Sequence, residues 1–129
     1  MKIGQLADAT GATAKTLRFY EDSGLLPPAK RAANGYRDYP PEAAARVSFI
    51  HRGQAAGLTL AQIRQILNIR DSGTAPCEHV RHLLDTRLST IDNQITQLTG
   101  LRDTISELRR QAEAVDPTAC DPAQVCTYL

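Results

Sequence analysis

The chain has 129 residues, of which 42% are hydrophobic and three are cysteines. This length suits one compact domain with an extension and is too short for two sizeable cores. No stretch approaches the ~20 apolar residues of a membrane span, so we expect a soluble, cytoplasmic protein that does not associate with membranes. In a reducing compartment, three cysteines favour metal-binding or reactive thiols over a disulfide framework.

Charge is distributed unevenly along the chain. Residues 1–70 contain ten Lys or Arg against five Asp or Glu, whereas residues 71–129 contain five against nine. The first part therefore has the balance of a module that binds a polyanion, and the second that of a solvated, self-associating one.

Two short helices are predicted at the start of the chain. Residues 3–9 and 13–23 carry apolar positions at helical spacing, and the sequence TGAT separates them. Thr13 is a suitable N-cap for the second helix, and Gly11 allows a positive φ in the turn. Gly24 and the prolines that follow it predict the end of the second helix. This pattern is typical of a helix-turn-helix.

A hairpin and a second helix pair are predicted next. The segment PPAKRAANGYRDYPP contains Asn-Gly between basic and aromatic residues, which predicts a small basic wing. A third helix is expected from Pro41 to about Ala55, with Ala45, Phe49 and Ala56 among its candidate inward residues.

The fourth helix should open with a capping box and end before a short linker. Thr59 and Gln62 have the spacing of such a box, and helical periodicity continues to about Arg70. Residues 71–76, DSGTAP, are predicted to be a linker.

One long helix is predicted over residues 77–115. It contains no proline, and its apolar residues recur at steps of three or four, as in a heptad seam. The seam comprises Leu84, Leu88, Ile91, Ile95, Leu98, Leu101, Ile105, Leu108, Ala112 and Val115. A lone helix would expose this seam to water, so we expect a homodimer formed through it.

The cysteines lie at the two ends of this predicted helix. Cys77 begins it, and Cys120 and Cys126 follow it in the tail. A straight helix would hold Cys77 about 50 Å from the pair, so one chain cannot bring all three thiols to one ion. An antiparallel dimer would create two three-thiolate sites, whereas a parallel dimer would gather like cysteines at each end. Thiolates favour mercury, lead, cadmium, zinc or monovalent copper, and His79 is a possible further ligand.

Three motifs carry a family resemblance. They are IGQLADATGATAKTLRFYEDSGLLPP, NGYRDY and GLTLAQI, within residues 3 to about 70. Together with the long helix, they resemble the MerR family of bacterial transcriptional regulators. The resemblance implies a mainly α-helical fold with a winged helix-turn-helix domain over residues 1–70 and the linker over 71–76. It further implies an antiparallel coiled-coil helix over 77–115 and a metal-binding loop and tail over 116–129.

The resemblance also implies which residues contact DNA. Arginines and tyrosines suit that role because they bind phosphates, and arginine also reads guanine. The implied contacts are Lys15, Arg18, Tyr20, Arg31, Tyr36 and Arg37. Leu17 and Phe19 are expected to pack in the core, and Tyr39 is expected either to pack under the wing or to donate to a phosphate.

The metal-sensing branch of the family resembles this chain most at Cys77. Sensors of mercury, zinc, cadmium and lead have a cysteine there, whereas copper and gold sensors have a serine, so the resemblance implies a divalent ion over monovalent copper. The chain departs from the family at Ala112, where the first loop cysteine is usual. Cys120 takes the place of the second, and Cys126 lies further along the tail. Either the loop is rebuilt around this pair or the site differs from that of the family.

The expected function is a metal-responsive regulator of the heavy-metal-resistance type. The resemblance implies that a homodimer binds a palindromic promoter and, on binding metal, distorts the DNA so that RNA polymerase can engage it. The alternative is a regulator of the same fold that senses redox state through a Cys120–Cys126 disulfide. An iron–sulfur sensor would need four cysteines, and a purely structural coiled coil would not need the basic motifs. No catalytic constellation is evident, so we do not expect an enzyme.

Overall fold

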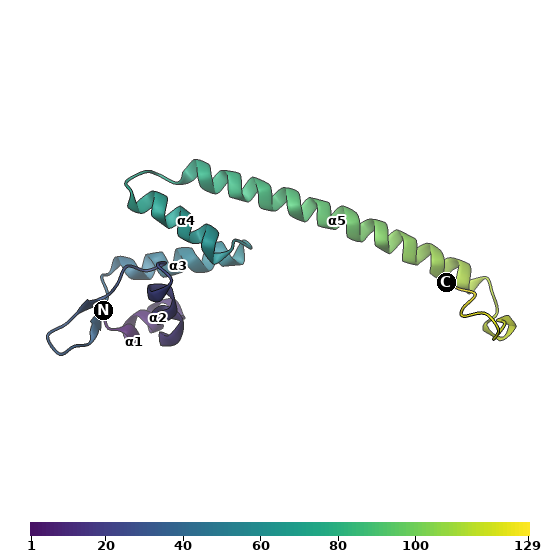
Figure 1. Cartoon of the computed structure of the whole chain (residues 1–129), viewed down its shortest axis with the longest axis horizontal. Helices are drawn as coiled ribbons and strands as arrows, with labels where there is room; N and C mark the ends of the chain where they lie inside the picture. The colour runs from purple at the N-terminus through teal and green to yellow at the C-terminus, as the bar shows by residue number, and fades with distance from the viewer. The chain divides into compact units, whose positions relative to one another are not determined.

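The computed structural model describes all 129 residues, which form two compact units, Met1–Leu84 and Asp85–Leu129. Figure 1 shows a mainly helical chain with one small hairpin, which confirms the predicted fold class. No helix is both long enough and apolar enough to cross a membrane.

The first two helices form the predicted helix-turn-helix. Helix α1 spans Ile3–Thr10 and helix α2 spans Ala14–Asp22. Thr13 caps α2, because its hydroxyl accepts a 3.1 Å hydrogen bond from the Thr16 amide. Gly11, in the turn, has a φ of 76°, a conformation that glycine adopts without steric cost. Both sequence predictions are confirmed.

The wing is a two-stranded antiparallel hairpin. Strand β1 (Lys30–Arg31) pairs with strand β2 (Arg37–Asp38), so that Lys30 lies opposite Asp38 and Arg31 lies opposite Arg37. The Asn34 side chain accepts a 3.1 Å hydrogen bond from the Tyr36 amide, and Gly35 has a φ of 82°. The Asn-Gly sequence therefore forms the turn that it predicts.

Helices α3 (Glu42–Ala55) and α4 (Leu60–Asp71) complete the N-terminal unit. The predicted capping box opens α4, with Thr59 and Gln62 bonded reciprocally at 2.9 and 3.1 Å. Helix α3 contacts both α1 and α4, and α1 contacts α2. The short helices thus enclose one apolar core.

Two of the candidate inward residues of α3, Ala45 and Ala56, were predicted wrongly. Ala45 and Ala56 are exposed and Phe49 is only partly buried. The inward residues are Ala43, Val47, Ile50 and Gly53. The sequence has three consecutive alanines at 43–45, and such small side chains do not mark a face, whereas the larger Val47 and Ile50 do.

The core lies entirely in the N-terminal unit. Its buried apolar residues come from all four helices and the loops between them. They are Leu6, Leu17, Tyr20, Leu25, Leu26, Tyr39, Ala43, Val47, Ile50, Leu58, Ile63, Ile66 and Leu67. Val80 and Leu83, from the start of the next helix, pack against this cluster.

Helix α5 spans Cys77–Glu113 without interruption, two residues shorter than predicted, and a 3₁₀ turn follows at Pro117–Ala119. No residue of α5 is buried within the chain. The large seam residues are between 45% and 65% exposed at Leu84, Leu88, Ile95, Leu98, Leu101 and Ile105. A row of exposed apolar side chains on one helix is what an unpaired coiled-coil strand presents.

Candidate nucleic-acid interface and metal site

A basic groove lies between α1, α2 and the wing. It brings together four predicted DNA contacts from α2 and the wing, namely Arg18, Arg31, Tyr36 and Arg37. The remaining lining residues come from α1 and the residue before it: Lys2, Ile3, Gly4, Gln5 and Asp8. Four cationic side chains therefore face one carboxylate, which is a suitable balance for a phosphate backbone. We call this surface the basic groove.

Lys2 is a groove residue that the sequence did not predict. It directly precedes α1, and its amide donates a 2.8 Å hydrogen bond to the Gln5 side chain. The only sequence signal was an isolated lysine next to a predicted helix start. Its place in the groove depends on the packing of α1 beside the wing, which lies about thirty residues later in the sequence.

Two predicted contacts lie outside the groove lining. Lys15 is exposed in the first turn of α2. Tyr20 is only 3% exposed, its hydroxyl donates a 3.3 Å hydrogen bond to Gln54, and burial raises its pKa. The Tyr20 ring also packs edge-on against His51, with ring centroids 6.2 Å apart. Tyr20 thus has a packing role that the sequence did not predict, and its DNA contact stays a prediction.

Burial differs among three residues for which the sequence suggests a packing role: Leu17, Phe19 and Tyr39. Leu17 is buried as expected, but Phe19 is 52% exposed, so the prediction that it packs in the core is wrong. A helix as short as α2 buries only one stripe, and Leu17 and Tyr20 occupy it. Tyr39 is 2% exposed, which identifies it as a packing residue beneath the wing.

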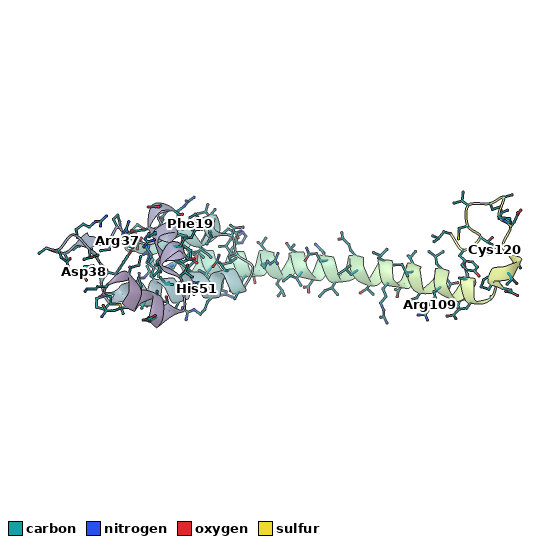
Figure 2. All side chains as sticks on the ribbon, turned by 90° about the horizontal axis from the view of Figure 1, so that it is seen from below. Phe19, Arg37, Asp38, His51, Arg109 and Cys120 are labelled. Atoms are coloured by element: carbon teal, nitrogen blue, oxygen red, sulfur yellow. The ribbon has the colours of Figure 1, made fainter.

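The arginines of the groove differ in how they are held. Arg31 donates a 2.9 Å hydrogen bond to the Gly35 carbonyl at the tip of the wing. Arg37, labelled in Figure 2, donates through Nε to Glu21 at 3.1 Å. Arg18 makes no side-chain hydrogen bond or ion pair, so its whole guanidinium is available to a ligand.

The three cysteines are free thiols. Cys77 and Cys126 are exposed, and Cys120, labelled in Figure 2, is partly buried. No group of three or more Cys, His, Asp or Glu side chains within the chain could hold a metal ion. Thiolates suit a soft or borderline ion, but the chain by itself does not gather a complete set of ligands.

The tail brings two of the thiols near a single hydroxyl. The Tyr128 hydroxyl donates a 3.0 Å hydrogen bond to the Val115 carbonyl and so closes the segment between them. Partial burial raises the pKa of Tyr128, and the charges of Cys120 and Cys126 raise it further. Cys120 and Cys126 both lie within the segment that this hydrogen bond closes.

His79 offers a weaker case as a ligand. It lies in the first turn of α5 and is partly buried, and its Nε2 atom is buried without a hydrogen-bond partner. Its part in metal binding stays a prediction.

A winged helix-turn-helix followed by one long helix with an exposed seam defines a class of DNA-binding regulator. Residues 1–69 match the family model described as MerR HTH family regulatory protein, and residues 44–108 match the model described as MerR, DNA binding. The chain belongs to the MerR family of helix-turn-helix regulators.

Relatives and solved structures resemble the chain over nearly its whole length. A ZntR homolog from Haemophilus influenzae is 35% identical, over 90% of this chain and 86% of the relative. The regulator HmrR from Rhizobium leguminosarum bv. viciae is 34% identical, over 93% and 92%. The transcription regulator PbrR691 from Ralstonia metallidurans CH34, solved in complex with lead(II), is 34% identical with a TM-score of 0.74, covering 93% of this chain and 94% of that one.

Proposed function

We propose that this protein is a metal-responsive transcriptional regulator that binds a palindromic promoter as a homodimer. Metal binding activates transcription by changing the shape of the bound DNA, and RNA polymerase is the functional partner. The functional segments are the DNA-binding domain over residues 1–70, the linker over 71–76, the dimerisation helix over 77–115 and the metal-binding loop and tail over 116–129.

The basic groove is the observation that supports this function most. Side chains suited to phosphates or bases reach one surface from α2, which is the recognition helix of the helix-turn-helix, and from the wing. They are Arg18, Arg31, Tyr36 and Arg37. A helix entering the major groove with a wing on the adjacent backbone uses this combination of contacts. Lys15 and Tyr20 complete the proposed set of contacts, and Lys2 adds a cation from the start of α1.

The metal site is proposed to form between two protomers. Cys77 of one protomer and the Cys120–Cys126 pair of the other would bind one ion, because no single chain assembles three ligands. An antiparallel pairing of α5 seams provides this arrangement twice in a dimer. Three thiolates suit mercury, lead, cadmium or zinc, and the relatives include a ZntR homolog and a regulator solved with lead(II).

A redox function is the second candidate. Cys120 and Cys126 lie in the one segment that the Tyr128–Val115 hydrogen bond closes, and in this function oxidation joins them into a disulfide in place of binding metal. The exposed Cys77 has no part in that reaction, and this favours the metal function, which uses all three thiols.

In vitro transcription separates the two candidates. The reduced protein is incubated with polymerase and a promoter carrying the inverted repeat that the protein selects, with and without lead, zinc, cadmium or mercury salts. We expect DNA binding in all conditions and transcription only with metal. Transcription that responds to a thiol oxidant and to none of the ions would establish the redox function instead.

A further inference from the structure

Glu21 lies at the end of α2 and binds two parts of the wing at once. Its Oε1 atom accepts a 2.6 Å hydrogen bond from the Ala29 amide, just before β1. Its Oε2 atom accepts a 3.1 Å hydrogen bond from Arg37 Nε, at the start of β2. The Glu21 side chain is 9% exposed, so water competes little for these two bonds.

The wing needs such support for two reasons. Each strand is two residues long, and a hairpin of this size is not stable alone in water. In addition, Arg31 lies directly opposite Arg37 across the hairpin, and like charges in that position repel. The Glu21 carboxylate supplies the counter-charge on the side of the hairpin that faces α2.

The hydrogen bond to Glu21 leaves the two terminal nitrogens of Arg37 free. It uses Nε, and neither terminal nitrogen of Arg37 has a partner within the chain. Arg37 lines the basic groove together with Arg18 of α2. Fixing Nε therefore orients the two terminal nitrogens before any phosphate arrives, which reduces the entropy lost on binding.

We propose that Glu21 is a positioning residue for DNA recognition: its carboxylate fixes the wing to the recognition helix and presents Arg37 to a phosphate. This inference rests on the proposed DNA-binding function. It assigns a role in DNA affinity to an acidic residue that does not touch the DNA.

The direction in which DNA affinity changes when Glu21 is mutated distinguishes a positioning role from a simple effect of its charge. Removing a carboxylate near a phosphate backbone normally strengthens binding, because it removes a repulsion. Glu21→Gln should do the reverse if the carboxylate positions Arg37. Asp22→Asn is the matched control, because Asp22 is the next residue, is exposed and makes no side-chain hydrogen bond or ion pair.

The experiment uses the full chain and the inverted-repeat duplex that the wild-type protein selects from a random library. Binding is measured against salt concentration, and contacted phosphates are mapped by ethylation interference. We expect Glu21→Gln to bind about tenfold more weakly, with the salt slope lower by about one phosphate contact per protomer. Interference should be lost at the phosphates under the wing and kept at those beside α2. Asp22→Asn should bind as tightly as wild type or more tightly.

Two further variants guard against a folding defect in Glu21→Gln. Glu21→Asp keeps the charge but shortens the reach to Arg37, so it should lose part of the affinity and part of the wing footprint. In an Arg37→Ala background, Glu21→Gln should cause no further loss, because its effect acts through Arg37. Circular dichroism verifies the helix content of each variant.

The outcomes are distinguishable. If wild type selects no duplex, the proposed function fails, and the inference fails with it. If wild type binds and both Glu21→Gln and Glu21→Asp bind as tightly with an unchanged footprint, the proposed function stands and the positioning role is wrong.

Discussion

Arg18 is the groove arginine whose guanidinium has no partner within the chain, whereas Arg31 and Arg37 are each held by one. Arg18→Ala should therefore remove a DNA contact without loosening the wing. We expect operator binding to weaken by ~1 to 3 kcal/mol. Arg52→Ala, at an exposed position outside the groove lining, removes the same charge and should have a much smaller effect. Gel-shift titrations measure both, and equal affinities for the two variants would remove Arg18 from the proposed contacts.

A second effect at the residue scale depends on pH. Arg46 donates hydrogen bonds to both oxygens of Asp71, at 2.8 and 2.9 Å. These hydrogen bonds, and to a lesser extent the positive charge of Arg46, hold the pKa of the Asp71 carboxyl below its usual value. A lowered folded-state pKa contributes stability above the ordinary carboxyl pKa of about 4, and this is lost as pH falls through the lowered value.

Asp71→Asn should thus reduce the free energy of unfolding more at pH 7 than in acid. The Asp71 side chain is 46% exposed, so solvent screening limits the loss to under ~1 kcal/mol. Urea denaturation at pH 7 and at about pH 3 measures the difference between variant and wild type. A difference of equal size at both values would show that the charge of Asp71 has no part in it.

Single residues were predictable where the signal is local. Thr13 and Thr59 cap their helices as predicted, because a cap involves residues only three apart. Phe19, Ala45 and Lys2 were misjudged or missed, because their exposure depends on how separate helices pack. The Glu21–Arg37 ion pair was also missed, because it joins residues sixteen positions apart and no regular spacing in the sequence indicates it.

At the scale of the elements, Gly53 controls how closely α3 approaches α4. A Cβ atom built there would lie 2.9 Å from two side-chain atoms of Ile63, a residue with no exposed surface. Gly53→Ala therefore requires the core to shift, which destabilises the fold by ~1 to 3 kcal/mol. This loss opposes a gain in helix propensity of up to ~1 kcal/mol.

We expect Gly53→Ala to lower the free energy of unfolding by ~1 kcal/mol or more. Gly4→Ala is the control, because a Cβ at Gly4 in α1 meets nothing within 4 Å, and this variant should be neutral or slightly stabilising. Thermal unfolding of the two variants beside wild type measures the contrast. An increase in stability at position 53 equal to that at position 4 would contradict the close packing of α3 on α4.

The elements themselves were largely predictable, because each has both a period and a boundary signal. There are two exceptions. The buried face of α3 was not predictable, because a run of alanines hid its period. The attachment of the wing to α2 was not predictable either, because it depends on a tertiary contact. The long helix was predicted to within two residues of its end, since prolines lie on either side of it and its apolar period is continuous.

At the scale of the whole molecule, the exposed seam of α5 requires a partner. Leu88→Asp places a charge on this seam, where pairing would bury it without a counter-ion, and should shift the dimer to monomer. Asn93→Asp adds the same charge to α5 at an exposed position outside the seam and should leave the dimer intact. Analytical ultracentrifugation distinguishes them. A stable dimer of Leu88→Asp would mean that another surface joins the protomers.

The assembly and the metal site were only partly predictable from the sequence. The heptad pattern predicts self-association, but the order of the tail around Cys120 and Cys126 depends on a hydrogen bond from Tyr128 to Val115. That bond joins residues thirteen apart in a segment without periodicity. The sequence therefore indicates candidate ligands, Cys77, Cys120 and Cys126, but not how the tail folds around the last two.

The central claim, that each metal site takes thiolates from both protomers, is tested by mixing two variants. One carries Cys77→Ser and the other carries both Cys120→Ser and Cys126→Ser. Each homodimer lacks a complete site, but the heterodimer has one, because one chain keeps Cys77 and the other keeps the tail pair. The readout is the ultraviolet charge-transfer absorption of a thiolate–metal bond on titration with lead, cadmium or mercury. We predict absorption at about half the wild-type stoichiometry per heterodimer and a marked loss in each homodimer, all three species still binding DNA. Metal binding by the Cys77→Ser homodimer as tight as that of wild type would contradict the intersubunit site.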